Sequence, residues 1–353
     1  MNHRHALLLA IGCTACAPDH KLETIVESPP YRSFSTETLN DKLLQPGTLF
    51  FTDGSDPEAP RIVEVNREGE VVWQHRVPRA LINSNTIMDA EPTASGGAIF
   101  IMDAIGVIEV DRAGEEVRRF ESMLPSHDAD ILDNGNWLCT NGWARVGEPH
   151  FMEVDPSGQV VWSWDGLAQY DREPYNRIYR EGWIHANAAE RMSDGATLVS
   201  LRNFNTVAML EPNGDVRWEL MFNDIDPEVY YTDAYDVARG AKPHDPSMTA
   251  DGTVLVAVKE PNILYEIDPS SREVVWSWSP ETDGSLKMRD ANRLPNGNTL
   301  VTSTETILEV TSDGEVVWRL DADLSIIGED GPTDPRPFYK TLLIDTEGVT
   351  HGS

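Results

Sequence analysis

A twelve-residue segment recurs six times along the chain, and each copy has two short apolar runs around a polar turn. Alternating apolar residues on both sides of Asp, Asn, Ser, Pro and Gly are typical of a tight antiparallel hairpin. Five copies carry Gly four residues before their last residue, where the turn needs a positive φ. The copies are IVEVNREGEVVW from Ile62, VIEVDRAGEEVR from Val107, FMEVDPSGQVVW from Phe151, VAMLEPNGDVRW from Val207, LYEIDPSSREVVW from Leu264 (one residue longer) and ILEVTSDGEVVW from Ile307.

A second repeated phrase precedes each hairpin and begins with Gly, at Gly47, Gly97, Gly135, Gly195, Gly252 and Gly297. A further strand precedes that Gly, as in HDADILDN from His127. One unit therefore has four antiparallel strands, and six units predict an all-β fold, a six-bladed β-propeller. The recurring Trp at the hairpin end is expected to pack between neighbouring blades. We expect the segment Tyr339 to Asp345 to close the ring by pairing with the blade that begins near Leu43.

The N-terminal residues resemble a signal for export. Arg4 lies in a short basic region, an apolar stretch follows, and Cys13 stands where a bacterial lipoprotein signal carries its lipidated Cys. A plain export signal is the alternative. We therefore divide the chain into a signal over 1–16, a linker over 17–42 and one propeller domain over 43–353, and we expect a periplasmic or cell-surface protein that contacts membrane only through an anchor at Cys13. Cys139 is then the single Cys of the folded part, so no internal disulfide can form there.

The formal net charge of −31 argues against a nucleic-acid partner, because a surface that binds phosphates needs Lys and Arg. We interpret the charge as a solvated acidic shell that favours solubility.

Two longer connections between hairpin and next inner strand, 166–182 and 223–242, are rich in tyrosine. Long loops on a rigid scaffold often carry function, so Tyr175 and Tyr231 are candidates for stacking on a flat ligand. The alternative is a loop that packs on itself and uses tyrosine as filler. The six tyrosines in these connections are Tyr170, Tyr175, Tyr179, Tyr230, Tyr231 and Tyr235.

Histidines recur at one position of successive inner strands. Residues eight before the repeated Gly are Asp89, His127, His244 and Arg289, and His185 stands ten before its Gly. The ends of the second strands add two further cations, Arg202 and Lys259. Because inner strands begin around the central channel, these side chains are expected to form a positive pocket suited to an anion such as a tetrahedral oxyanion.

Four interpretations fit such a cluster. Three histidines could hold zinc or copper, although a nearby Arg would repel the metal. They could act as general acids and bases, or one could be a nucleophile whose transferred group is stabilised by the other cations. They could also be structural histidines bonded to backbone. We expect neither a metal ion nor a cofactor.

The stretch from His185 to Trp218 carries His-x-Asn, then Ser-x-Arg-Asn, then Asn-Thr and the hairpin. It resembles the core motif of bacterial aryl-sulfate sulfotransferases, propeller enzymes that move a sulfuryl group between phenols without a nucleotide donor. The inner strands from His127 and His244 are similar to other motifs of that family.

The resemblance implies a ping-pong transfer from an aryl sulfate to a phenol through a sulfohistidine at His244. It implies that the residues binding the sulfuryl oxygens are His127, His185, Asn187 and Arg202. Because Arg289 and Lys259 are also expected at the channel, we add them to the candidate substrate-binding residues. The strand after His244 departs from the family pattern, since it ends in Val-Lys-Glu (Val258 to Glu260).

Two other functions stay open at this point. A non-catalytic propeller at the cell surface could keep the pocket and only bind an anion. A quinone-cofactor dehydrogenase could share the Gly-x-Val-x-Trp endings, but such proteins typically need more blades, a calcium site and often a vicinal Cys pair.

Overall fold

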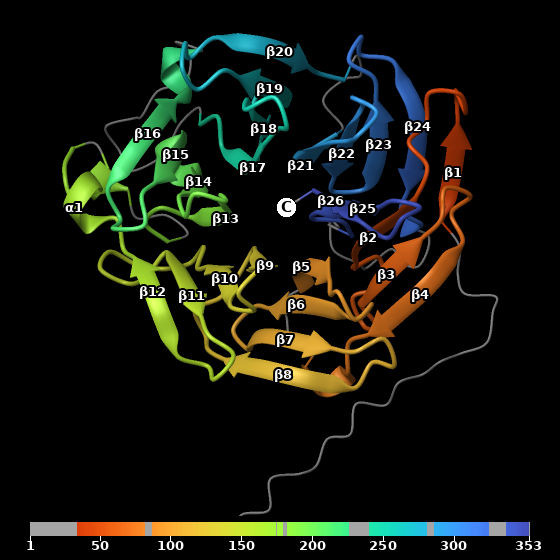
Figure 1. Cartoon of the computed structure of the whole chain (residues 1–353), viewed down its shortest axis with the longest axis horizontal. Helices are drawn as coiled ribbons and strands as arrows, with labels where there is room; N and C mark the ends of the chain where they lie inside the picture. The colour runs from red at the N-terminus through yellow and green to blue at the C-terminus, as the bar shows by residue number, and fades with distance from the viewer. Residues whose placement is uncertain are drawn as a thin grey trace, which may run out of the picture.

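The computed structural model describes residues 34–81, 87–173, 175–178, 182–225, 240–280, 286–324 and 337–352. Within them, six antiparallel sheets stand in a ring around a central channel, which confirms the predicted six-bladed β-propeller (Figure 1). The signal over 1–16 and its Cys13 lie outside the described residues, so export and lipidation stay predictions. No helix in the described part of the chain is both long enough and apolar enough to cross a membrane.

Four blades follow the expected order of four strands from the channel outward. The second blade has β5 (Ile87–Pro92), β6 (Ala98–Met102), β7 (Gly106–Val110) and β8 (Glu116–Glu121). The third has β9 (Ala129–Ile131), β10 (Trp137–Thr140), β11 (Phe151–Val154) and β12 (Val160–Trp164). The fourth has β13 (Ala186–Arg191), β14 (Thr197–Leu201), β15 (Thr206–Leu210) and β16 (Val216–Met221). The fifth has β17 (Pro243–Met248), β18 (Val254–Val258), β19 (Ile263–Ile267) and β20 (Val274–Trp278).

The first and sixth blades combine strands from both ends of the chain, which closes the ring. The first joins β2 (Thr48–Asp53), β3 (Arg61–Val65) and β4 (Val71–Arg76) to β25 (Thr341–Ile344) and β26 (Thr350–His351). The pairing of β25 with β2 confirms the predicted closing strand. The sixth blade has β21 (Met288–Arg293), β22 (Thr299–Ser303), β23 (Thr306–Val310) and β24 (Val316–Asp321), and β1 (Ser35–Thr38) pairs with β24.

Strand β1 corrects the expected linker over 17–42. Four residues of that range are the outermost strand of the sixth blade, and Phe34 just before them is buried against Phe51. The sequence signal was weak because Ser35–Thr38 has no apolar residue, so its pairing comes from backbone hydrogen bonds to an open sheet edge.

The short helical turns all lie in connections between strands. They are α1 (Leu167–Tyr170), η1 (Arg79–Leu81), η2 (Tyr175–Arg177), η3 (Arg202–Phe204) and η4 (Phe222–Asp224).

The hairpin turns explain why five of the six repeated segments carry Gly four residues before their last residue. All five glycines predicted to need a positive φ have one, between 83° and 89°. In the fifth blade Arg272 takes the same position with a φ of 63°, which is unfavourable for a residue with a Cβ. The five glycines are Gly69, Gly114, Gly158, Gly214 and Gly314.

Four of the five Trp residues that end a hairpin donate their indole N–H to a carbonyl of the next blade, in line with the predicted packing between blades. The Trp73 indole donates to the carbonyl of Arg112 at 3.0 Å, and Trp162 donates to the carbonyl of Pro212 at 3.1 Å. In the second blade Arg118 replaces Trp, and its guanidinium lies 3.7 Å from the Trp137 ring centroid while donating to the Gly135 carbonyl. The scaffold is therefore tied from blade to blade at its rim.

Candidate functional site

The starts of the inner strands bring the predicted residues together at one mouth of the channel. His127 precedes β9, His185 precedes β13, and His244 and Arg289 lie in β17 and β21. Arg202 begins η3 at the end of β14, and Lys259 follows β18. The three histidines are buried.

His127 and His185 are in direct contact. Their rings meet edge to face with centroids 4.9 Å apart. Trp143 lies against both, with its ring centroid 4.9 Å from that of His127 and 4.8 Å from that of His185. The Nδ1 atom of His127 lies 2.9 Å from the hydroxyl of Ser126.

One ring nitrogen of His244 is hydrogen-bonded to a backbone carbonyl, and the other faces the guanidinium of Arg289. Its Nδ1 lies 2.8 Å from the carbonyl of Lys242, so that nitrogen carries the proton and donates. Its Nε2 lies 3.2 Å from Nη1 of Arg289, so Nε2 accepts. The tautomer fixed in this way leaves the Nε2 lone pair facing the guanidinium, where an anionic group would also bind.

The electrostatic environment keeps the imidazoles of His127 and His244 neutral. Burial lowers the pKa of His244 well below its usual value, and the charges of Arg289, Arg202 and Lys259 lower it further, against the bond to the Lys242 carbonyl. Burial, then Arg202 and Arg289, lower the pKa of His127 to about 3. Both guanidinium groups therefore act on two histidines at once, so the predicted cations and histidines form one positively charged cluster.

The backbone around the site is strained. His127, His185, Lys242 and Asp245 all have a positive φ although none is Gly. Such conformations are uncommon and cluster at functional sites, where the surrounding structure must hold them. Gly142 contributes to this packing, because a Cβ there would lie 2.3 Å from Nδ1 of His127.

Asn187 lies beside the site, but its amide already has a structural partner. Its Nδ2 donates to the carbonyl of Pro243 at 3.2 Å, immediately before His244. The hydroxyl of Ser200 donates to the same carbonyl at 2.8 Å. In this structure Asn187 therefore anchors the start of β17 and orients His244.

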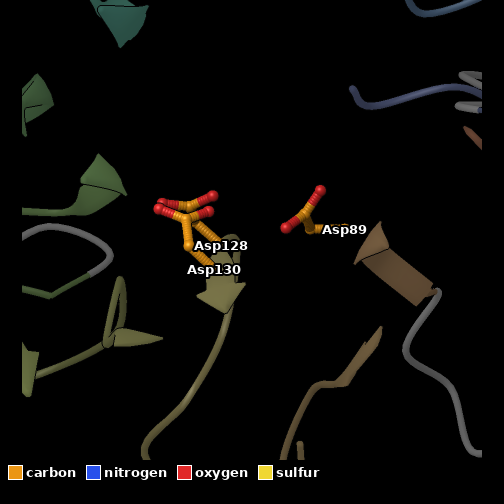
Figure 2. Close-up of side chains that lie close together, drawn as sticks. All are labelled: Asp89, Asp128 and Asp130. Carbon is orange, nitrogen blue, oxygen red and sulfur yellow. The ribbon is translucent and has the colours of Figure 1, made fainter. Parts of the chain in front are cut away.

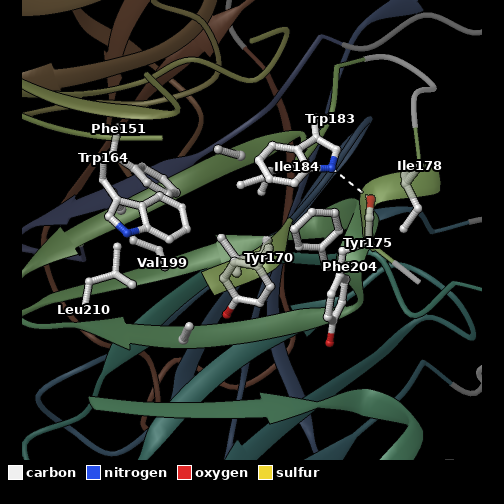
Figure 3. Close-up of a cluster of buried hydrophobic side chains, with 14 of the residues drawn as sticks. Phe151, Trp164, Tyr170, Tyr175, Ile178, Trp183, Ile184, Val199, Phe204 and Leu210 are labelled. Atoms are coloured by element: carbon white, nitrogen blue, oxygen red, sulfur yellow. Dashed lines mark hydrogen bonds between the residues drawn. The ribbon is translucent and has the colours of Figure 1, made fainter. Parts of the chain in front are cut away.

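The structure does not place Tyr175 at the mouth. Tyr175 is buried in a cluster with Tyr170, Phe204 and Trp183, its carbonyl accepts the Trp183 indole at 2.8 Å, and its hydroxyl contacts Sδ of Met221 (Figure 3). The prediction that Tyr175 stacks on a ligand is wrong, since this connection packs on itself. Tyr231 lies outside the described residues, so its predicted role is untested.

A layer of buried carboxylates lies beyond the histidines along the channel, and sequence analysis missed its role. Asp89, Asp128 and Asp130 each place an oxygen within 4.8 Å of the others (Figure 2). The ammonium of Lys340 lies 2.5 Å from Oδ1 of Asp128 and 3.0 Å from Oδ1 of Asp245. Lys340 stands eight residues before Gly348, the same spacing that identified His127, so the signal was present in the sequence.

These carboxylates also connect blades. Asp89 accepts the backbone N–H of Ala129 at 3.1 Å, and Asp128 accepts that of Ala189 at 2.7 Å. Oxygens of this kind can hold a hard cation, but here Asp89 and Asp128 accept from backbone, and Asp128 also accepts from Lys340. The layer thus links the second blade to the third and the third to the fourth beside one buried ammonium.

The register corrects one equivalence drawn from sequence. Ala90 pairs with Phe100 as Ala129 pairs with Cys139, so Asp89 matches Asp128 rather than His127. In the second blade the turn glycine is Gly96, with a φ of 81°, and counting from Gly97 shifts the alignment by one residue.

Comparison with known proteins assigns the chain to a family. A family model described as arylsulfotransferase (ASST) matches residues 36–224, which is more than half of the chain. The chain belongs to the arylsulfotransferase family. A second model, described as outer membrane protein assembly factor BamB, matches residues 152–323 and overlaps the first. No curated protein sequence matches the chain.

Solved structures similar to this family member support the fold. A protein of unknown function from Bacteroides caccae has a TM-score of 0.57 at 18% identity, covering 84% of this chain and 98% of its own. A streptogramin B lyase has a TM-score of 0.54 at 13% identity, covering 92% of this chain and 96% of its own. At these identities the likeness shows a shared propeller and nothing about activity.

Proposed function

We propose that this chain is an aryl-sulfate sulfotransferase that moves a sulfuryl group from an aryl sulfate to a phenol through His244. The observation that carries the proposal is the fixed tautomer of His244, with Nδ1 on the Lys242 carbonyl and Nε2 facing Arg289. Membership of the arylsulfotransferase family supports the same chemistry.

In the first half-reaction the Nε2 lone pair of His244 attacks sulfur. The new N–S bond forms as the bond from sulfur to the phenolic oxygen breaks, and the phenolate leaves with that electron pair. Because the pKa of His244 is lowered, Nε2 is unprotonated at neutral pH, and its lone pair can attack once Arg289 donates to the sulfuryl oxygens instead.

Arg289 and Arg202 would stabilise the sulfuryl oxygens while charge shifts toward the leaving oxygen. His127 and His185 can donate N–H groups to the same oxygens. A bound anion offsets the guanidinium charges that lower the pKa of His127, so this imidazole becomes a better base once the donor is bound.

In the second half-reaction an acceptor phenol attacks the sulfur of sulfo-His244. Its oxygen forms the new O–S bond, the N–S bond breaks, and the electron pair returns to Nε2. The phenolic proton passes to a neighbouring base, for which both His127 and His185 stay candidates, and the first phenolate gains a proton, so the overall exchange balances.

The test is steady-state transfer from 4-nitrophenyl sulfate to phenol. We expect parallel-line ping-pong kinetics in the wild type and loss of transfer in H244A. The matched control is H351A, because His351 bonds Asp345 in the C-terminal part of the first blade and touches none of the site histidines. Unchanged transfer in H244A would overturn the nucleophile assignment, and binding of the aryl sulfate without phenol release would favour a non-catalytic anion-binding propeller.

A further inference from the structure

Trp143 differs from every other tryptophan of the chain. Its side chain is 40% exposed, and it is the single aromatic residue among the exposed large hydrophobic side chains of the described part. It does not end a hairpin, and it links no two blades at the rim. It follows Gly142 at the end of β10, where the second strand of the third blade reaches the channel mouth.

The indole is held in a fixed position. Its Nε1 donates to Oδ2 of Asp103 from the second blade at 3.3 Å. The backbone N–H of Gly142 donates to the Ser126 hydroxyl at 2.9 Å, and the Ala144 carbonyl accepts the N–H of Trp183 at 2.9 Å. A side chain whose indole N–H is bonded and whose neighbouring backbone is anchored loses little conformational freedom when a ligand binds.

The indole also borders the anion pocket directly. Its ring centroid lies less than 5 Å from the ring centroids of both His127 and His185. The indole plane makes an angle of 89° with the His185 ring. The imidazoles therefore cover part of the indole, and the remaining surface faces solvent at the mouth. A flat apolar surface beside a cationic pocket is complementary to a ligand that has an aromatic ring next to an anionic group.

We propose that Trp143 is the specificity-determining residue that stacks on the aromatic ring of the donor and acceptor, an inference that rests on the proposed function for the identity of the ligand. The pocket of histidines and guanidinium groups holds the sulfur group, and Trp143 selects the part of the substrate outside the pocket. Ligands with a larger flat ring gain more from this surface than ligands with a small or aliphatic group.

The experiment is calorimetric titration with naphthalene-2-sulfonate, benzenesulfonate and methanesulfonate. In a sulfonate the sulfur is bonded to carbon, so no phenol can leave and the measurement reports binding alone. For W143L we expect roughly tenfold weaker binding of naphthalene-2-sulfonate and unchanged binding of methanesulfonate. W143F, which keeps a smaller ring, should retain binding but lose part of the preference for naphthalene over benzene.

Three results would overturn the proposal. The wild type could fail to bind naphthalene-2-sulfonate, or W143L could bind it as tightly as the wild type does. In the third, W143L would lose as much affinity for methanesulfonate as for naphthalene-2-sulfonate. If W143L does not fold, an unchanged naphthalene preference in W143F overturns it instead. The experiment distinguishes failure of the proposed transferase function from failure of the proposed role of Trp143. A Trp143-dependent aromatic preference in a protein that transfers no sulfuryl group supports the role of Trp143 and contradicts the transferase.

Discussion

Adjacent residues of the inner strands belong to two regions with opposite charge. His127, His244 and Arg289 meet in the cationic mouth, where Nη1 of Arg289 lies 3.2 Å from Nε2 of His244. The residue that follows each of them is an aspartate in the deeper layer. These aspartates are Asp128, Asp245 and Asp290.

The aspartates contact a different set of groups from the histidines. Asp128 and Asp245 pair with Lys340, and Asp290 accepts the backbone N–H of Thr341 at 2.9 Å. Successive side chains of a strand point to opposite sides, so a two-residue unit can serve both regions. The third, fifth and sixth blades therefore each contribute one residue to the cationic mouth and the next residue to the acidic layer.

The largest effect should follow removal of the buried ammonium. K340M leaves Asp128 and Asp245 without their cation, and we expect a loss of about 3–5 kcal/mol in the free energy of unfolding, measured by urea denaturation. The control is K42M, since Lys42 is exposed and lies in the N-terminal part of the fold. A loss in K340M no larger than in K42M would show that the acidic layer does not need Lys340.

A change in the cationic mouth should act on transfer instead. R289M removes the group that faces Nε2 of His244, and we expect sulfuryl transfer to fall about 100- to 1000-fold. The matched control is R293M, because Arg293 lies on the same strand but pairs with Glu266 and stacks on Trp276. An equal loss of sulfuryl transfer in R289M and R293M would contradict a specific role of the cationic mouth in transfer.

The acidic layer should also give a pH-dependent stability. Burial raises the pKa of Asp89 to about 8, although Lys340 opposes the shift. A raised folded-state pKa favours the protonated native state, so this contribution is full below the unfolded pKa and is lost as pH rises through about 8.

We therefore expect the melting temperature to fall between pH 7 and about pH 8, with no further loss from Asp89 above that pH. This window lies above the titration of histidine in both the folded and the unfolded state. D89N, which cannot ionise, should have a shallower slope. An identical slope in the wild type and D89N would contradict the assignment.

The smallest effect concerns the hairpin scaffold. R272G places Gly at the one repeat position where another residue takes a positive φ, so we expect a gain of about 0.5–1 kcal/mol in the free energy of unfolding. G314A, the reverse change in the sixth blade, should destabilise the protein. A loss of stability in R272G would mean that the Arg272 side chain contributes more than its backbone costs.

The fold could be predicted from sequence because its determinants are local. Hairpin turns, alternating strands and the closing Trp all repeat within short segments, and two of the three site histidines, His127 and His244, followed from one constant spacing. Lys340 and Asp128 were harder to connect, since they are 212 residues apart and meet only when the ring closes.

The loops were the least predictable part. Tyrosine composition favours a ligand-stacking lid and a self-packed loop equally, and only the burial of Tyr175 against Phe204 and Trp183 decides between them. Trp143 carried no repeat signal, because its role depends on lying beside two histidines from different blades.

The central claim is that His244 is the residue that takes up the sulfuryl group. The most direct measurement is intact-mass analysis after incubation with an aryl sulfate and no acceptor, followed by peptide mapping under conditions that preserve a sulfohistidine. We predict one added sulfuryl group on His244, lost again when phenol is added and absent in H244A. Release of phenol with no sulfuryl group on the protein, or a sulfuryl group on another residue, would contradict it.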